Sequence, residues 1–222
     1  MLLATGLGNT LKITFVALII GILLGSIVAT VRSTYDKNGA DMAKRNKGGY
    51  VVLSIFNIIC KLYLTVIRGT PMVVQLLIMY FIIFASSNNG LMVAMIAFGI
   101  NSGAYVAEIF RSGIMSIDNG QFEAGRSLGF NYRQTMFYIV MPQAFKNVLP
   151  ALGNEFISLL KETSVSGYIA LQDLTKGGDI IRSRTYDAFM PLIAVALIYL
   201  VMVLIFSRLV SLLERRLRNS DH

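Results

Sequence analysis

Long apolar runs, separated by shorter polar stretches, dominate the pattern of residues along this chain. The runs cover roughly residues 8–31, 58–85, 91–113, 146–168 and 190–213. Each run has about 20 residues, which is enough for a helix to cross the roughly 30 Å hydrocarbon layer of a bilayer. The pattern therefore predicts an all-α integral membrane protein with about five transmembrane helices, in one domain over residues 1–222.

The composition agrees with a chain embedded in lipid. Of the 222 residues, 55% are hydrophobic and 14% are charged. The first apolar run has no charged segment ahead of it and no conspicuous cleavage site, so we interpret it as a retained helix. No internal repeat is apparent, and the basic segment 38–49 is expected to be a flexible loop.

The charges indicate a topology rather than a nucleic-acid ligand. The chain has a net charge of +8, but no nucleic-acid recognition module accompanies the basic residues, which cluster beside the apolar runs. Three segments contain most of them: Arg32, Lys37, Lys44, Arg45 and Lys47; Arg111, Arg126, Arg133 and Lys146; and Arg208, Arg215, Arg216 and Arg218. The positive-inside rule places these segments in the cytoplasm, with the N-terminus outside and the C-terminus inside.

The residues offer little for catalysis. A single cysteine, Cys60, and a single histidine at the C-terminus, His222, allow no intrachain disulfide, no Cys- or His-rich metal site and no Ser-His-Asp arrangement. The phosphate-binding motif G-x-x-x-x-G-K-[ST] does not occur in the sequence. We therefore expect no catalytic residues, no metal and no cofactor in this chain, and any nucleotide must be bound by a partner.

The connection at about 114–142, between the third and fourth spans, is the longest one predicted in the cytoplasm. Asp118 with Gln121 has the signature of a helix start, and Gly129 can end that short helix in the left-handed conformation. Asn131 with Gln134 repeats the start signature for a second short helix, ending near position 142. From this pattern alone, the segment is either a docking knob for another protein or an amphipathic loop lying on lipid.

The residues of this connection resemble a known signature. The stretch EAGRSLGFNYRQTMFYIVMP resembles the cytoplasmic signature of the membrane subunits of bacterial ATP-binding cassette importers: Glu-Ala-Ala, three residues, Gly, nine residues, Ile, one residue, Leu-Pro. The matching residues are Glu123, Ala124, Gly129, Ile139 and Pro142. Gly125 replaces the second Ala and Met141 the Leu, and Gly125 is expected to loosen the short helix by up to about 1 kcal/mol.

Four further stretches make the chain similar to the polar amino acid uptake permeases, which are type I importers. They are TLKIT at 10–14, RGTPMVVQL at 68–76, NSGAYVAEIFRSGI at 101–114 and PQAFKNVLPALGNEFISLLKETSV at 142–165. The resemblance implies a multi-pass protein of the bacterial cytoplasmic membrane that transports an amino acid. The partners that it implies are ABC ATPase subunits carrying ATP and Mg, an extracytoplasmic substrate-binding protein, and a second permease copy or a homologous permease, all beside membrane lipids.

In that family the signature forms a coupling helix that sits in a cleft of the ATPase subunit. The resemblance thereby implies an ATPase-coupling role for a short set of residues in this chain. They are Glu123, Ala124, Gly125, Ser127, Leu128 and Gly129.

Polar residues in the fourth span form the densest intramembrane group. Asn154, Ser158 and Lys161 share one helix face, which Glu155 and Glu162 widen. One interpretation is an intramembrane ion pair, or a helix end close to the outer surface.

The other interpretation of this group is a cavity wall that binds a zwitterion. Glu162 would then meet an α-ammonium group, and Lys161 or the hydroxyls of Thr163 and Ser164 would meet a carboxylate. The resemblance favours this interpretation, because the family's substrate path runs between permease subunits.

The third span repeats this arrangement with Asn101, Tyr105 and Glu108. Glu108 could bind a cationic group, or it could pair with Arg111 or Arg68, and we favour the structural pairing.

In the second span, Arg68, Gly69, Thr70 and Pro71 interrupt the helical pattern. Pro71 removes a backbone donor and Gly69 weakens the helix. The segment is either irregular backbone that lines a pathway or a kinked helix with a snorkelling Arg68.

A rival function from another class remains. A secondary transporter or ion channel could use Glu108, Lys161 and Glu162 as a relay, without an ATPase. An intramembrane enzyme fits less well, because no nucleophile and base pair is visible.

Overall fold

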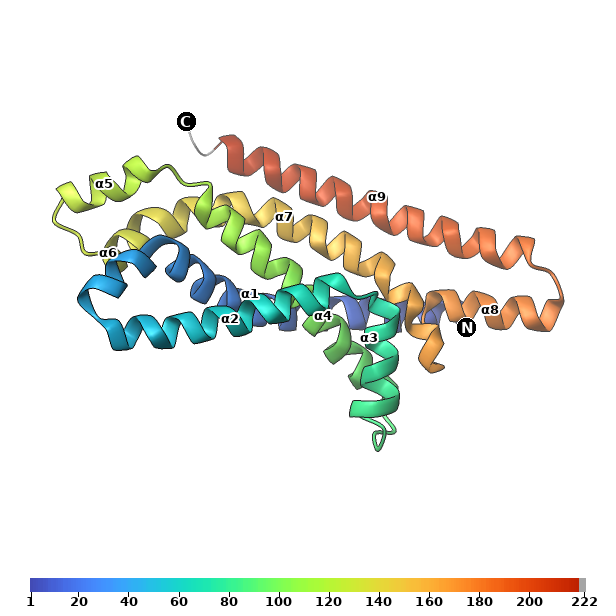
Figure 1. The fold of residues 1–222 in the computed structure, drawn as a ribbon. Helices are drawn as coiled ribbons and strands as arrows, with labels where there is room; N and C mark the ends of the chain where they lie inside the picture. The colour runs from blue at the N-terminus through green and yellow to red at the C-terminus, as the bar shows by residue number, and fades with distance from the viewer. Residues whose placement is uncertain (220–222) are drawn as a thin grey trace.

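The computed structural model describes residues 1–219, and all regular structure within that range is helical (Figure 1). The α-helices are α1 (Leu2–Arg45), α2 (Lys47–Gly69), α3 (Met72–Ile78), α4 (Gly90–Met115), α5 (Asn119–Ser127), α6 (Tyr132–Thr135), α7 (Met141–Glu162), α8 (Leu174–Thr185) and α9 (Phe189–Asn219). Two π-helical segments, Met79–Ile83 and Met136–Val140, follow α3 and α6, and a 3-10 helix, Thr163–Ile169, follows α7. This architecture confirms the predicted all-α class.

Four helices are long and apolar enough to cross a membrane: α1, α2, α4 and α9. Helix α7 has 22 residues, but its sequence includes Lys146, Glu155 and Lys161 among the apolar positions. The count of five spans therefore stays a prediction.

The prediction of a flexible loop at 38–49 is wrong, because helix continues almost throughout this segment. Only Asn46 leaves the helical conformation, and its side-chain oxygen accepts a hydrogen bond of 2.9 Å from the backbone N–H of Gly49. The residues before it, ADMAKR, include strong helix formers and no proline. Gly39 does not break the helix, since Tyr35 and Tyr50 stack beside it at a centroid distance of 6.1 Å.

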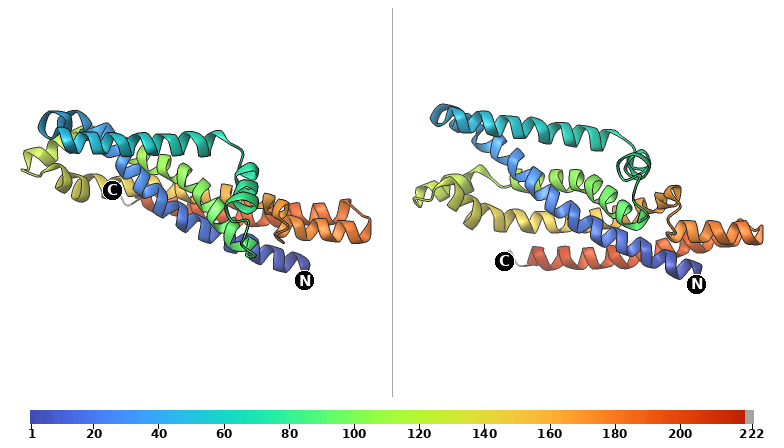
Figure 2. Two further views of the ribbon diagram at one scale, coloured as in Figure 1. Left: turned by 60° about the horizontal axis from the view of Figure 1, so that its bottom comes forward. Right: turned by 90° about the horizontal axis from the view of Figure 1, so that it is seen from below.

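The predicted single span at 58–85 is also wrong. Helix α2 begins earlier, at Lys47, and ends at Gly69, after which Thr70 is extended with φ −121° and ψ 146°. Proline disfavours helical backbone in the residue before it, so the chain leaves α2 at Thr70 and starts α3 after Pro71. In Figure 2, right, α3 is seen nearly along its axis while α2 lies lengthwise, so the two helices run crosswise.

The fourth predicted span, 146–168, differs at both ends. Helix α7 starts at Met141, and its α-helical part ends at Glu162, where the 3-10 helix begins. The second short helix does not end near Pro142 but runs through the π-helical segment into α7. Pro142 lies just after the π-helical segment, and its missing N–H coincides with the change from π-helical to α-helical hydrogen bonding.

The two ends of the bundle carry different segments (Figure 1). The tip of the α1–α2 hairpin and α5 lie at one end, where Lys37 Nζ donates a 2.9 Å hydrogen bond to Asn119 Oδ1. The N-terminus and α8 lie at the other end, where Asn9 Nδ2 donates a 2.8 Å hydrogen bond to the carbonyl of Gln172. The segments that the sequence predicts in the cytoplasm thus gather at one end.

Helices α1 and α4 cross closely, with small residues at the contact. A Cβ atom added at Gly25 would lie 2.6 Å from Val106 Cγ1 and 2.8 Å from the backbone nitrogen of Ala107. On the other helix, a Cβ at Gly99 would lie 2.7 Å from the side chain of Ile20. In a membrane, helix association depends on such close packing rather than on the hydrophobic effect.

Enlarging Gly25 should therefore separate α1 from α4. We expect Gly25→Leu to destabilise the protein by about 1–3 kcal/mol, the usual range for overpacking, and to lower its melting temperature in detergent. Gly8→Leu is the matched control, because a Cβ at Gly8 in the same helix meets nothing within 4 Å. Equal melting of the two variants would contradict the close crossing.

Candidate functional site

A groove of about 410 Å³ lies between α2, α4 and α7, and we call it the central groove. It is lined by Arg68, Tyr105, Glu108, Ile109, Ser112, Gly113, Asn147, Ala151 and Glu155. Both carboxylates and the guanidinium thus border one space. These lining residues come from three of the spans that the sequence predicts.

Glu155 contributes a half-buried carboxylate from α7. Ser102 Oγ, on α4, donates a 2.8 Å hydrogen bond to Glu155 Oε1. The bond fixes one carboxylate oxygen and connects α7 to α4. In a space of low dielectric, a fixed carboxylate strongly attracts a cationic group.

Glu108 is paired with both arginines that the sequence offered as partners. Its carboxylate lies 3.3 Å from Arg111 Nε and 3.9 Å from Arg68 Nη1. Arg111 also pairs with Asp36 of α1 at 3.1 Å, and Arg68 lies over the Tyr105 ring at 5.6 Å. These pairs connect three helices at one wall of the central groove.

The break between α2 and α3 is stabilised by Gln75. Its Nε2 atom lies 2.7 Å from the carbonyl oxygen of Ile67 and 2.8 Å from Thr70 Oγ1. Its Oε1 atom accepts a 3.0 Å hydrogen bond from Asn101 Nδ2 on α4. Arg68 and Gly69 thus belong to the last turn of α2, and only Thr70 and Pro71 leave the helical conformation. The Gln75 side chain donates to the carbonyl oxygens of Ile67 and Thr70 at this break.

The predicted polar face of the fourth span exists on α7. Asn154, Ser158 and Lys161 are exposed, whereas Leu159 and Leu160 are buried. In the described part of the chain, no ion pair within 4 Å joins Lys161 to Glu162. None of these polar residues lines the central groove, to which α7 contributes Asn147, Ala151 and Glu155.

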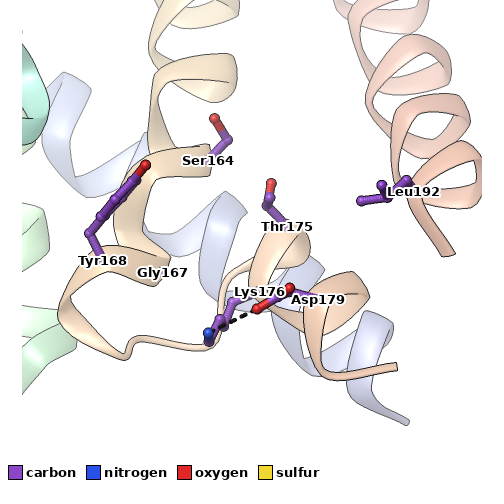
Figure 3. Close-up of a pocket in the computed structure, with 7 residues that line it drawn as sticks. All are labelled: Ser164, Gly167, Tyr168, Thr175, Lys176, Asp179 and Leu192. Atoms are coloured by element: carbon purple, nitrogen blue, oxygen red, sulfur yellow. Dashed lines mark hydrogen bonds and ion pairs between the residues drawn. The ribbon is translucent and has the colours of Figure 1, made fainter. Parts of the chain in front are cut away.

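Thr163 and Ser164 do not continue the polar face of α7, because the α-helix ends at Glu162 and a 3-10 helix follows. Thr163 is fully buried and donates a 2.8 Å hydrogen bond to the carbonyl of Leu160. Ser164 lines a separate pocket of about 320 Å³ together with residues of α8 and α9, shown in Figure 3.

This pocket contains the ion pair of Lys176 and Asp179, with a separation of 3.0 Å (Figure 3). The neighbouring Arg182 and Lys176 lower the pKa of the Asp179 carboxyl below its usual value. The Asp179 carboxyl is therefore ionised at neutral pH.

Helix α5 has one exposed face and one buried face. Glu123, Ala124 and Ser127 are exposed, and Leu128 exposes 70% of its surface. Gly129 ends the helix with φ +80°, as the sequence predicts. Asp118 caps the helix start by accepting a hydrogen bond from the backbone N–H of Gly120.

Gly125 differs from the other signature residues, because it is buried. A Cβ added to it would lie 2.6 Å from both Cγ2 and Oγ1 of Thr135. The glycine thus permits close contact between α5 and α6 instead of presenting a face to a partner. The expected loosening of α5 by Gly125 is offset by this packing.

The start of α6 is fixed as the sequence predicts. Asn131 and Gln134 form a reciprocal capping box, with hydrogen bonds of 3.0 and 2.9 Å. Phe122 of α5 stacks on Tyr132 of α6 at a centroid distance of 6.4 Å, and burial raises the pKa of the Tyr132 hydroxyl. Lys37 of α1 lies over the other ring, 4.6 Å from the Phe122 centroid.

The sequence did not identify Gln75, Asn147 or Ser102 as site residues. It indicated Glu155 only as a residue that widens the polar face of the fourth span. One signal was present for Gln75, which is the only polar residue in the apolar stretch MVVQLLIM after Pro71. Ser102 carries no comparable signal. Its importance depends on Glu155, which is 53 residues away in the sequence.

Comparisons with known proteins agree with this architecture. The arginine transport system permease protein ArtQ of Bacillus subtilis (strain 168) is 38% identical over 220 residues, covering 97% of this chain and 92% of ArtQ. The putative glutamine transport system permease protein GlnP of Rickettsia typhi is 35% identical, covering 94% and 89%. The L-cystine transport system permease protein TcyB of Bacillus subtilis is 33% identical, covering 97% and 86%.

Solved structures resemble the chain over nearly its whole length. The crystal structure of an amino acid ABC transporter with histidines matches with a TM-score of 0.84 and 44% identity, covering 97% of this chain and 94% of that one. An inward-facing methionine ABC transporter, MetNI, matches with a TM-score of 0.78 and 19% identity, covering 97% and 96%, and so shares the fold.

A family description also matches most of the chain. Residues 21–219 match the binding-protein-dependent transport system inner membrane component. Together with the relatives above, this match shows that the chain belongs to the family of binding-protein-dependent transport system inner membrane components, among permeases of amino acid ABC transporters.

Proposed function

We propose that this chain is the membrane-spanning permease subunit of an ATP-driven importer of polar amino acids. The observation that carries the proposal is the exposed face of α5, which lies at the end of the bundle where the basic segments gather. ATP and Mg would be bound by separate ATPase subunits. An extracytoplasmic binding protein would deliver the substrate at the end of α8.

A movement of α5 can be transmitted to the central groove through a series of direct contacts. Lys37 connects α5 to α1 through Asn119, and Asp36 connects α1 to Arg111 on α4. Arg111 in turn pairs with Glu108 in the groove wall. Closure of the ATPase subunits on α5 would thereby bias the groove between two arrangements.

The central groove suits the two charges of an amino acid. Glu155 is the carboxylate without an arginine partner among the described residues, so it can bind an α-ammonium group. Arg68 exposes 44% of its side chain, and its one ion pair among the described residues is the 3.9 Å contact to Glu108, so it can bind a carboxylate. Asn101 and Thr70 position this arginine's helix through Gln75.

The groove is open on one side, and a second permease copy or a homologous chain would complete the pathway. The exposed polar face of α7, with Asn154, Ser158 and Lys161, and the half-buried Glu162 would then border the path between the two subunits. The permeases named for arginine, glutamine and cystine all transport amino acids, which supports this substrate class.

A bulky side chain on the exposed face of α5 should prevent ATPase coupling. We expect Ala124→Trp to lower ATP-driven uptake in proteoliposomes by at least about tenfold, equivalent to losing about 1.4 kcal/mol of docking free energy. ATPase subunits should no longer copurify stoichiometrically. Ser183→Trp, on an exposed position of α8 at the other end, should leave ATPase copurification unchanged, and normal uptake by the Ala124 variant would refute the assignment.

Removing the charge of Glu155 should weaken substrate handling. Glu155→Gln keeps the volume and still accepts a hydrogen bond from Ser102, but it loses a charge-assisted contact of roughly 1.5–3 kcal/mol. Uptake at low substrate concentration should fall about ten- to a hundredfold, while ATPase copurification stays normal. Glu214→Gln, an exposed carboxylate on α9, is the control, and equal uptake by both variants would exclude Glu155 as a substrate ligand.

The proposed orientation places the N-terminus outside and the α1–α2 hairpin in the cytoplasm. In a Cys60→Ser background, Asn88→Cys should react with an impermeant maleimide added to intact cells, and Gly48→Cys should react only after lysis. Both positions are exposed in the structure. The opposite labelling pattern would reverse the orientation and remove α5 from the cytoplasm.

A further inference from the structure

A second cavity, which we call the inner cavity, lies between α1, α2 and α4. It has a volume of about 440 Å³ and is lined by Arg32, Lys61, Leu64, Thr65, Arg68, Gly69 and Glu108. Only Arg68 and Glu108 also line the central groove. The remaining lining residues have no role in the transport mechanism described above.

The inner cavity has more positive than negative charge. Three cations, Arg32, Lys61 and Arg68, face one carboxylate, Glu108, which Arg111 already shares. In the part of the chain that the structure describes, neither Arg32 nor Lys61 has an ion-pair partner within 4 Å. The charge balance of this cavity therefore favours an anionic ligand.

Arg32 supplies a second, independent observation. Its Nε atom is buried and has no hydrogen-bond partner among the described residues. An unsatisfied buried donor costs about 1–3 kcal/mol, and more for a charged group. An anion with several acceptor oxygens would satisfy this donor and the Lys61 ammonium together.

The position of the cavity along α1 and α4 indicates the level of the inner membrane interface. The hairpin tip lies at the same end of the bundle as α5 (Figure 1), which the proposed orientation puts in the cytoplasm. Glu108 is about 10 Å along α4 from Met115, where that helix ends on the same side, at 1.5 Å per residue. Arg32 follows Ile27, the last exposed large apolar residue of α1 before the hairpin tip. Lys61 lines the same cavity from α2. Ile58, Leu62 and Val66 next to it on the helix expose 62%, 63% and 49% of their surface.

We propose that the inner cavity binds the phosphodiester of an anionic phospholipid from the cytoplasmic leaflet. Arg32 and Lys61 donate hydrogen bonds to the phosphate oxygens, and the acyl chains lie along the exposed apolar face of α2. Basic pockets between transmembrane helices on the cytoplasmic side are suited to such headgroups. A free phosphate ion would satisfy the donors but would leave the apolar face of α2 uncovered.

Lipid binding by the purified full-length permease tests this proposal without measuring transport. Native mass spectrometry would measure the binding of phosphatidylglycerol and, in a separate titration, of zwitterionic phosphatidylethanolamine. The double variant Arg32→Gln with Lys61→Gln should bind phosphatidylglycerol about 25-fold more weakly than the wild type, at about fivefold for each basic residue. Its binding of phosphatidylethanolamine should not change.

Two further variants keep the test decisive. Lys47→Gln removes an exposed basic residue from the start of the same helix and should leave phosphatidylglycerol binding unchanged. Lys61→Gln alone, at an exposed position, should bind phosphatidylglycerol about fivefold more weakly than the wild type. This single variant replaces the double variant if the double variant melts at a lower temperature. Equal phosphatidylglycerol binding by the wild type and the Lys61 variant would overturn the proposal.

Competition separates the possible sources of the anion. Inorganic phosphate and a mixture of amino acids, each in excess, should not displace bound phosphatidylglycerol. Displacement by inorganic phosphate would assign the cavity to a free anion, and displacement by amino acids would assign it to the substrate path. Either result would overturn the lipid assignment, while the proposed transport function would be unaffected.

Discussion

The close crossing of α1 and α4 is the contact on which the other functional features depend. Gly25 and Gly99 let the two backbones approach, and residues farther along the same helices then reach different partners. Helix α4 contributes Tyr105 and Glu108 to the central groove. Helix α1 continues past the crossing, so that Lys37 contacts α5. The packing of α1 against α4 thereby determines how the groove and the proposed coupling surface are placed relative to each other.

Local rules predicted the features that depend on neighbouring residues. The capping box of Asn131 with Gln134 and the left-handed Gly129 need only a few residues of sequence, and both are present. The exposed and buried faces of α7 follow from helical periodicity alone. Prediction failed where a glycine has a tertiary reason, as at Gly125, which is buried against Thr135, or where one polar residue replaces a whole loop, as Asn46 does.

The candidate site could be predicted only in part, because its members come from separate helices. Spacing placed Tyr105 and Glu108 on one face, and both line the central groove. Spacing could not show that Glu155, rather than Lys161 or Glu162, faces the same space, since this depends on how α7 is rotated and shifted along its axis against α4. The hydrogen bond between Ser102 and Glu155 fixes both the rotation and the shift. It cannot be inferred from either helix alone.

The ion pairs from Asp36 to Arg68 explain how charged residues can occupy this region of a membrane protein. Each internal member has two partners: Arg111 contacts Asp36 and Glu108, and Glu108 contacts Arg111 and Arg68. Removing one member would leave a neighbouring charge poorly compensated, which is strongly unfavourable in a medium of low dielectric. A shift of α1, α2 or α4 by itself would have the same effect. The pairs therefore favour joint movement of the three helices, and such movement is what a coupling surface at one end needs in order to change a groove in the middle of the bundle.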